Sequence, residues 1–191
     1  MPSLLDHFRI VAPLYDRIFS YDGDDRLKEH LQLPGQGWLL DAGGGTGRVA
    51  QTLRDLTGQV VILDESEGML RQARDKGLIG VRGEVEALPF RSGAFPRILT
   101  VDTFHHLRDQ AVATCEMMRA LATEGRIVVQ EPDIRHRGVK LIALAEKLLL
   151  MRSRFRTPQV MQRMFEACEA RVSVRQEGPH FWLIAEKKSG L

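Results

Sequence analysis

A glycine-rich turn at residues 41–48, with the sequence Asp-Ala-Gly-Gly-Gly-Thr-Gly-Arg, is the strongest sign of ligand chemistry in the sequence. It follows a short apolar run and opens a stretch, residues 49–56, whose apolar residues recur at helical spacing. Glycine has no Cβ, so the backbone can come close to a ligand. The start of a helix adds free N–H groups and the positive end of a dipole. The turn therefore predicts a bound small molecule.

The spacing of these glycines separates the candidate ligands. A dinucleotide fingerprint needs glycine at its sixth position, and counting from Gly43 that position is Arg48, which would obstruct close packing of a helix on a strand. No Gly-Lys-Ser/Thr follows, so a Walker-type phosphate loop is absent from the sequence. The spacing is instead Asp-x-Gly-x-Gly-x-Gly, from Asp41 to Gly47. It favours a ligand with an amino-acid end over one held by its phosphates.

Two acidic residues follow the next apolar run, residues 60–63. Asp64 ends that run and lies 19 residues after Gly45. A carboxylate at this point can accept hydrogen bonds from both hydroxyls of a ribose. Glu65 is a second candidate for the same site, although an exposed acid at a strand end is an equally good interpretation of it.

The elements that must position these residues alternate along the chain. We expect strands at 38–40, 60–64, 78–82, 97–101 and 126–130, and helices at 49–56, 69–76 and 111–121. Such alternation indicates βαβ units and a mainly parallel sheet, which binds ligands at the carboxyl ends of its strands.

The last third of the sequence has a different pattern. We expect helices at 139–151 and 158–170, then two strands at 171–176 and 181–186 joined by Glu-Gly-Pro-His. The whole chain, residues 1–191, is predicted to be one α/β domain. Its fold is Rossmann-like, with a seven-stranded, mostly parallel sheet, a C-terminal antiparallel hairpin and helices on both faces.

Composition excludes several classes of protein. The chain has 191 residues, 43% hydrophobic and 27% charged, which is typical of one globular domain. Its apolar runs are far shorter than the ~20 residues that span a bilayer, and its first residues do not resemble a secretion signal. The two cysteines, Cys115 and Cys168, are too few for a disulfide framework or a cysteine metal site. We expect a cytoplasmic protein without a metal.

Charge is distributed unevenly. Residues 1–134 hold 15 basic and 20 acidic residues, whereas residues 135–191 hold 12 and 5. The basic segment at 135–156 suits an anionic substrate, a membrane surface or nucleic acid, or it is simply a solvated face. Arginine outnumbers lysine 21 to 6 and asparagine is absent, which fits a thermophile or a GC-rich genome equally well.

Five ordered stretches carry a resemblance to a known family. They are LDAGGGTG at 40–47, LDESEGML at 63–70, GEVEALPF at 83–90, FHHL at 104–107, and MRAL at 118–121 followed by Gly-Arg at 125–126 and Glu-Pro at 131–132. With VAPLYD at 11–16 as the lead-in, residues 8–132 resemble the class I S-adenosylmethionine-dependent methyltransferases. Within that class they are similar to the small-molecule group of ubiquinone/menaquinone C-methyltransferases (methyltransferase type 11 like).

The resemblance implies that this chain binds S-adenosylmethionine and releases S-adenosylhomocysteine. Asp41 and the backbone of Gly43 and Gly45 would hold the methionine end of the cofactor. Asp102 and Thr103, just past the fourth strand, would lie near the same end.

For the rest of the cofactor the resemblance implies a second set of residues. Asp64 would bind the ribose, with Glu65 beside it, and Met69 would pack near the adenine. Glu84 and Val85 would contact the adenine edge, by side chain and backbone respectively. The family usually has aspartate at the Glu84 position, where the longer side chain still has the reach.

Two further departures concern structure more than ligand contact. Pro96 stands where the family commonly has aspartate before the fourth strand, and Ala170-Arg171 replaces a Gly-Phe pair often seen before the sixth strand. The stretch after Pro132 matches no substrate-specific signature.

Methyl transfer from a sulfonium is an in-line displacement, so the protein mainly supplies proximity and alignment. A general base is needed only where the acceptor must lose a proton. Candidates are His105 and His106 as catalytic residues, with Tyr15 and Glu131 as further candidates, and structural roles are open for all four. The resemblance also places Tyr15 over the cofactor.

The sequence therefore predicts a methyltransferase that acts on a small, apolar or quinone-like acceptor. Residues 1–35 would form cap helices and residues 133–157 a substrate lid, with the apolar helix at 139–151 alternatively a core or dimer element. We expect a monomer or homodimer, without nucleic acid and without integral membrane association. The alternatives are a non-catalytic S-adenosylmethionine- or S-adenosylhomocysteine-binding subunit, a nucleic-acid methyltransferase and, more remotely, a dehydrogenase.

Overall fold

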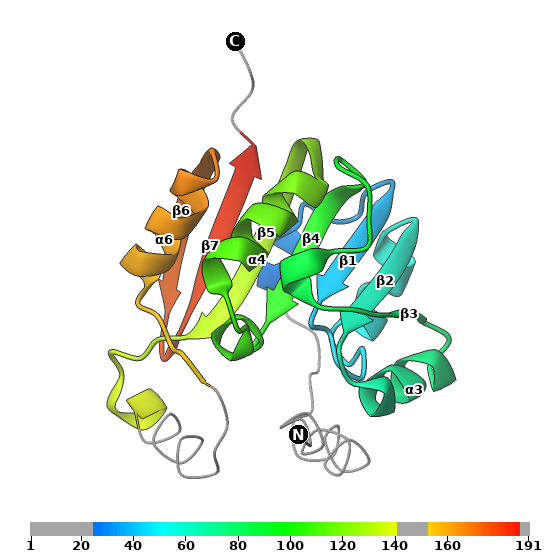
Figure 1. Cartoon of the computed structure of the whole chain (residues 1–191), viewed down its shortest axis with the longest axis horizontal. Coiled ribbons are helices and arrows are strands. Elements are labelled where there is room, and N and C mark those ends of the chain that lie inside the picture. The colour runs from blue at the N-terminus through cyan, green and yellow to red at the C-terminus, as the bar shows by residue number, and fades with distance from the viewer. Residues whose placement is uncertain (1–24, 141–152, 188–191) are drawn as a thin grey trace.

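The structure of the chain is a computed structural model that describes residues 25–140 and 153–187 (Figure 1). Tyr15, most of the expected cap at 1–35 and residues 141–151 of the expected apolar helix lie outside this part of the chain. The predictions for them, and the division of the chain into cap and lid, stay predictions.

Seven strands form one sheet in the order β3-β2-β1-β4-β5-β7-β6. The strands are β1 (Trp38–Ala42), β2 (Gln59–Asp64), β3 (Ile79–Arg82), β4 (Phe95–Val101), β5 (Leu121–Pro132), β6 (Ala170–Glu177) and β7 (His180–Lys187). The pairs among β1 to β5 are parallel, whereas β7 is antiparallel to both β5 and β6. The predicted fold class, mostly parallel with an antiparallel hairpin, is confirmed.

The order of the strands reverses between β1 and β4. The chain runs from β1 outward through β2 to β3, then returns to the other side of β1 with β4 and continues to β5. Ligands of open α/β sheets bind at such a switch point, outside the carboxyl ends of the strands.

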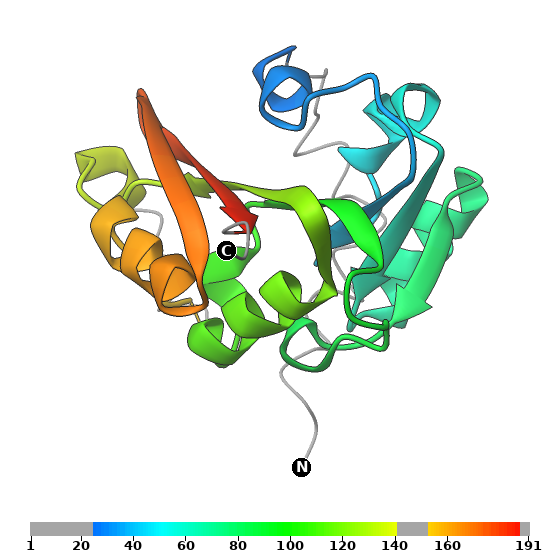
Figure 2. The same cartoon turned by 90° about the horizontal axis from the view of Figure 1, so that it is seen from above.

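Helices cover both faces of the sheet. They are α2 (Asp25–His30), α3 (Glu67–Asp75), α4 (Gln110–Ala120) and α6 (Pro158–Ala167), with the 3-10 turns η1 (Ala50–Thr52), η2 (Arg54–Leu56), η3 (Val85–Ala87) and η4 (Phe104–His106). Figure 2 shows α4 and α6 on one face and α2 on the other.

Each strand contributes side chains to both helical layers, because successive side chains of a strand point to opposite faces of the sheet. Leu40 of β1 joins Met117 of α4 and Phe165 of α6 in one buried cluster. Its neighbour Leu39 joins Leu27 of α2 in a second buried cluster on the other face. The central strands are therefore buried on both sides, which is typical of parallel sheets.

The segment after the glycine turn differs from its prediction. The apolar spacing at 49–56 predicts one α-helix, but the structure has η1 and η2 instead. The Leu53 amide donates to the Ala50 carbonyl, three residues back, and the Thr52 hydroxyl donates to the Val49 carbonyl. A threonine that bonds to the backbone in this way competes with the regular helical ladder.

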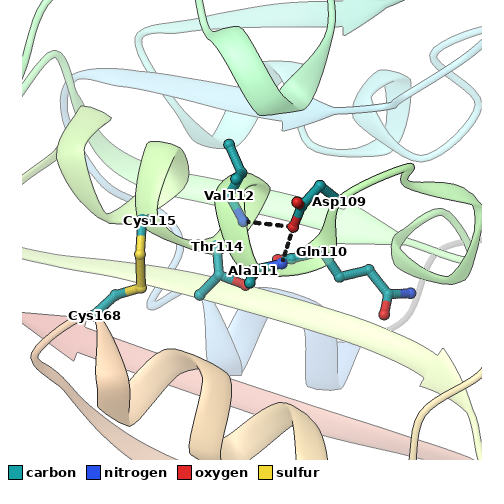
Figure 3. The surroundings of a disulfide bond; sticks show 7 residues. All are labelled: Asp109, Gln110, Ala111, Val112, Thr114, Cys115 and Cys168. Atoms are coloured by element: carbon teal, nitrogen blue, oxygen red, sulfur yellow. Dashed lines mark hydrogen bonds between the residues drawn. A yellow bond between two sulfur atoms is a disulfide. The ribbon is translucent and has the colours of Figure 1, made fainter.

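A disulfide joins Cys115 of α4 to Cys168, the residue that follows α6 (Figure 3). The two residues are 53 apart in the sequence. Two cysteines show no spacing pattern, so their pairing could not be predicted from sequence alone. Disulfides are rare in a reducing cytosol, with hyperthermophiles as an exception, and the cytoplasmic location stays a prediction.

In the described part of the chain, no helix has both the length and the apolar character needed to cross a membrane.

Candidate active site

A cavity of about 180 Å³ lies at the carboxyl ends of the parallel strands. Each strand end contributes: β1 gives Asp41, β2 gives Asp64, β4 leads to Asp102, and the turn after β3 adds Gly83 and Val85. The lining residues are Asp41, Gly43, Gly44, Gly45, Arg48, Val49, Asp64, Glu65, Ser66, Met69, Gly83, Val85, Val101, Asp102, Thr103, His106 and Leu107. This is the switch point of the sheet.

The glycine turn forms the floor of this cavity. The Gly43 amide donates to the Leu63 carbonyl at 2.7 Å, which holds the turn against β2. Gly43 has φ +74°, and a Cβ there would lie 2.1 Å from the Thr103 side chain. Gly45 has φ +55°, and the position of its missing Cβ is open apart from Asp64 at 3.9 Å. The turn therefore presents bare backbone to a ligand.

Asp64 is held in place by two backbone donors. Its Oδ2 accepts from the Gly45 amide at 3.0 Å, and its Oδ1 accepts from the Ser66 amide at 2.8 Å. Burial raises the pKa of Asp64 to about 6, although these two hydrogen bonds act in the opposite direction. The carboxylate is thus fixed at the carboxyl end of β2 and retains lone pairs that can accept further hydrogen bonds.

Asp41 is the more deeply buried acid. It is 2% exposed, and its Oδ2 has no hydrogen-bond partner among residues 25–140 and 153–187. Burial raises its pKa to about 7; Arg48 acts against this shift and Asp64 adds to it. An unpaired buried carboxylate oxygen is costly, and at a ligand cavity it indicates a missing donor.

The Arg48 side chain pairs with Asp102, the residue that follows β4. Its Nη2 lies 3.2 Å from Oδ2 of Asp102, which has φ +52°. Oδ1 of Asp102 is buried and without a partner in the described part of the chain. Arg48, the residue that argues against a dinucleotide fingerprint in the sequence, lines the cavity.

Glu84 lies outside the set of lining residues. Its Oε1 is 3.1 Å from Nη2 of Arg108, and the same nitrogen lies 2.8 Å from Oε2 of Glu65. Gly83 and Val85 on either side of Glu84 do line the cavity. The contact of Glu84 with adenine stays a prediction, and in this structure the Glu84 side chain pairs with Arg108.

The adjacent histidines have different environments. His106 lines the cavity, whereas His105 is 4% exposed and its Nδ1 lies 2.7 Å from Oε2 of Glu131. The other Glu131 oxygen accepts from the Phe104 amide at 2.8 Å. Burial, together with His105, lowers the pKa of His106 to about 3, so its ring is neutral at physiological pH.

Residues 153–155, where the second described part of the chain begins, contact these two histidines. The Ser153 hydroxyl is 3.3 Å from Nδ1 of His106, and the Arg154 amide donates to the His105 carbonyl at 2.7 Å. The ring of Phe155 stacks on His105 with a centroid distance of 4.2 Å. This end of the expected lid at 133–157 is thus tied to the site.

The structure brings most of the predicted site residues together. Those that line one cavity are Asp41, Gly43, Gly45, Asp64, Glu65, Met69, Val85, Asp102, Thr103 and His106. His105 and Glu84 do not line it, and Tyr15 lies outside the described residues. Sequence reasoning missed Gly44, Arg48, Val49, Ser66, Gly83, Val101 and Leu107. Most of these lie within three residues of a predicted one, and that proximity was the available signal.

A model of the methyltransferase domain family matches residues 40–129, from β1 into β5. The ubiquinone/menaquinone biosynthesis C-methyltransferase UbiE of Shewanella halifaxensis is 33% identical over 104 residues, which cover 49% of this chain and 41% of the relative. UbiE of Escherichia coli K12 is 36% identical over the same extent. The match thus spans about two fifths of the length of these curated relatives.

Solved structures share the fold over more of the chain. A methyltransferase from Thermotoga maritima, described as S-adenosylmethionine-dependent and as a possible histamine N-methyltransferase, has a TM-score of 0.80 at 20% identity and covers 97% of this chain and 100% of its own. Geranyl diphosphate C-methyltransferase from Streptomyces coelicolor, solved with S-adenosylhomocysteine, has a TM-score of 0.73 at 14% identity, covering 86% and 76%. The [4+2]-cyclase SpnF has a TM-score of 0.78 at 17% identity, and the match covers 97% of this chain and 96% of the cyclase. At these identities the likeness concerns the fold alone.

Proposed function

We propose that this chain, whose residues 40–129 form a class I S-adenosylmethionine-dependent methyltransferase domain, transfers a methyl group to a small, apolar or quinone-like acceptor. The observation that carries the proposal is the placement of Asp64. Its carboxylate is fixed between the Gly45 and Ser66 amides at the end of β2, across the open backbone of the glycine turn. That arrangement suits a ribose beside an amino-acid end.

The residues present fit the cofactor. The space beside Gly45 accommodates a ligand without a clash. Oδ2 of Asp41 and Oδ1 of Asp102, which have no partner among residues 25–140 and 153–187, would accept hydrogen bonds from a donor such as an ammonium group. Asp64 would accept from the ribose hydroxyls, with Glu65 beside it. Met69 and Val85 would pack on the adenine, and Thr103 would support the methionine end.

When bound, the cofactor supplies a methyl group already activated by its sulfonium, so the protein has to align and desolvate the acceptor. His106 faces the same cavity together with Val101 and Leu107, which makes this part of the wall apolar. Because its pKa is low, His106 would position the acceptor by a hydrogen bond rather than store a proton. His105 is engaged by Glu131, so its proposed part in catalysis is indirect.

The acceptor class rests on two supports. The curated relatives are named as ubiquinone/menaquinone C-methyltransferases, which supports a quinone-like acceptor. Among the described residues of the basic segment 135–156, three arginines are used within the fold, and Arg154 donates to the Arg108 carbonyl. Arg135 pairs with Asp133 and Arg156 donates to Gln110. We therefore propose a small-molecule substrate rather than nucleic acid, and a cytoplasmic monomer or homodimer.

A second candidate is a protein that binds S-adenosylmethionine without transferring its methyl group. The similarity of the fold to a [4+2]-cyclase makes clear that the fold alone does not determine the reaction. Tight binding of the cofactor with no turnover against any acceptor would favour this candidate.

The test is calorimetric titration with S-adenosylhomocysteine and, separately, with NAD. We expect the wild-type protein to bind the first in the micromolar range and not the second, and Asp64→Ala to lose at least tenfold in affinity. Asp75→Ala, at the exposed end of α3, is the matched control and should bind like wild type. A methyl-transfer assay with quinone precursors and other small acceptors follows. Binding of NAD without binding of S-adenosylhomocysteine would overturn the proposal.

A further inference from the structure

The disulfide between Cys115 and Cys168 has no part in the proposed function. Cys115 lies in α4 and is exposed, whereas Cys168, which follows α6, is half-buried (Figure 3). None of the described residues that line the candidate active site comes from α4 or α6. The bridge is therefore open to solutes and separate from that site.

Two surface hollows flank the bridge, and both cysteines line each of them. The first, of about 510 Å³, extends toward Ala111 of α4, and the second, of about 440 Å³, extends toward Arg119 at the other end of that helix. A volume of this size accommodates a small organic ligand. A molecule in either hollow would lie against the sulfur atoms.

The first hollow combines an apolar wall with one positive charge. Its lining residues are Ala111, Cys115, Val160, Arg163, Met164, Ala167 and Cys168. Nε of Arg163 donates to the Gln159 carbonyl within α6, and no carboxylate in residues 25–140 or 153–187 pairs with this arginine. A guanidinium binds carboxylates through two parallel hydrogen bonds. The hollow therefore suits a ligand that carries a carboxylate.

The two helices are also held together without the bridge. Met117 of α4 and Phe165 of α6 belong to one buried apolar cluster, and Cys168 packs against it. Breaking the S–S bond thus leaves α4 and α6 packed on each other and the two sulfur atoms close enough to join again. The bond can open and close within the folded protein.

We propose that the bridge between Cys115 and Cys168 is a site of reversible thiol–disulfide exchange with a small thiol that carries a carboxylate, such as glutathione. Arg163 binds the carboxylate of this ligand. The ligand thiolate attacks Sγ of Cys115, the more exposed of the two sulfur atoms. A new S–S bond joins the ligand to Cys115, and the old bond breaks with its electron pair on Sγ of Cys168, which takes up a proton from water.

A second thiol completes the exchange. It attacks the ligand sulfur of the mixed disulfide, which releases Cys115 as a thiolate and the ligand as its own disulfide. Two ligand thiols are thereby oxidised to one disulfide, and the protein bridge is reduced to two thiols. The reverse sequence closes the bridge again when the disulfide of the ligand accumulates.

The rate at which the native bridge is reduced tests the proposal. Oxidised protein is mixed with millimolar glutathione or with 2-mercaptoethanol, which has no carboxylate, and acid-quenched samples are read by intact mass. We expect glutathione to reduce the bridge without denaturant, through an adduct that peptide mapping locates on Cys115. In Arg163→Gln the rate with glutathione, relative to that with 2-mercaptoethanol, should fall about threefold to tenfold. Arg71→Gln, the same change at an exposed position of α3, should retain the wild-type ratio.

Variants with a single cysteine identify the sulfur atom that reacts. Cys168→Ser leaves Cys115 as the free thiol, and Cys115→Ser leaves Cys168. Treated with the disulfide of glutathione, Cys168→Ser should form the mixed disulfide several times faster, because its thiol is the exposed one. A faster reaction of Cys115→Ser would overturn the assignment of Cys115 as the point of attack.

Two further results would contradict the proposal. A bridge that resists millimolar glutathione until the protein is denatured is a closed structural cross-link, not an exchange site. Equal ratios of the two rates in wild type and in folded Arg163→Gln would remove the carboxylate site and with it the acidic class of thiol. Melting temperatures report whether each variant folds. Should Arg163→Gln not fold, the ratio is measured in wild type at low and high salt, where screening of Arg163 should lower it and an unchanged ratio would again contradict the carboxylate site.

Discussion

Nδ1 of His105 lies 2.7 Å from Oε2 of Glu131, and both side chains are at least 95% buried. Glu131 is the next-to-last residue of β5, and its second oxygen accepts from the Phe104 amide, so this one carboxylate joins β5 to the η4 turn that presents His106 to the cavity. We predict that Glu131→Gln lowers the free energy of unfolding by about 2 kcal/mol, because hydrogen bonds to a buried charge are replaced by weaker ones. Urea titration measures the change, with Glu29→Gln at an exposed position of α2 as control.

The same substitution should disturb the site locally. Since Glu131 fixes the turn that carries His106, the ring resonances of His106 should shift in Glu131→Gln and not in Glu29→Gln. Unchanged stability in Glu131→Gln would mean that the carboxylate contributes nothing that an amide cannot replace.

His106 is predicted to remain neutral far below the usual pKa of histidine. Burial, together with the neighbouring His105, lowers its pKa to about 3. The unfolded chain takes up this proton near pH 6.5, so the contribution of His106 to stability is present above that pH and is lost as the pH falls toward 3. NMR titration of labelled histidine should find this ring uncharged at pH 5. A His106 midpoint between pH 6 and 7 would contradict the prediction.

The architecture and the position of the site followed from local patterns. Apolar runs that end at Asp41 and Asp64 predicted parallel strands with a site at their carboxyl ends, because a buried strand and a glycine turn are both encoded within about ten residues. The order of the strands confirms this fold class. The α-helix predicted at 49–56 was wrong, because this segment forms two 3-10 turns in which the Thr52 hydroxyl bonds to the Val49 carbonyl. Apolar spacing alone does not distinguish these turns from an α-helix.

The relationships that sequence patterns missed join residues far apart in the chain. Arg48 and Asp102 are 54 residues apart, and Glu84 is engaged by Arg108 at the rim. His105 and His106 are adjacent in sequence, but His105 contacts Glu131 whereas His106 lines the cavity. This difference depends on how the η4 turn packs against β5. Such pairings depend on the packing of the whole sheet, and no local spacing encodes them.

Asp41 should make the unliganded protein less stable as the pH rises. Its pKa is raised to about 7 by burial, with Asp64 adding to the shift and Arg48 opposing it. Between about pH 4 and 7 the folded state therefore binds more protons than the unfolded state, so the free energy of unfolding falls as the pH increases. Asp41→Asn removes this slope and should be more stable than wild type at pH 8 by up to about 4 kcal/mol. Equal stability of the two proteins at pH 8 would contradict the raised pKa.

Ligand binding should depend on pH in the opposite sense. An ammonium group binds the ionised form of Asp41, so the affinity for S-adenosylhomocysteine should rise as the pH increases from 5.5 to 8. Calorimetry at pH 6.5 in two buffers of different ionisation enthalpy should detect release of protons on binding. In Asp41→Asn this release should decrease, and an unchanged release would assign the protons to another group such as Asp64, whose pKa is raised to about 6.

The bridge between Cys115 and Cys168 should stabilise the packing of α6 on α4 (Figure 3). It closes a loop of 53 residues that includes β5 and the chain leading to α6. By the loop-entropy argument, such a cross-link contributes about 2–4 kcal/mol. The double variant Cys115→Ser, Cys168→Ser is predicted to melt several degrees below the oxidised wild type. Wild type treated with dithiothreitol is the matched control and should melt close to the variant. A variant that melts with the oxidised wild type would show that the two helices need no cross-link, since the neighbouring Met117 and Phe165 are already buried in one cluster.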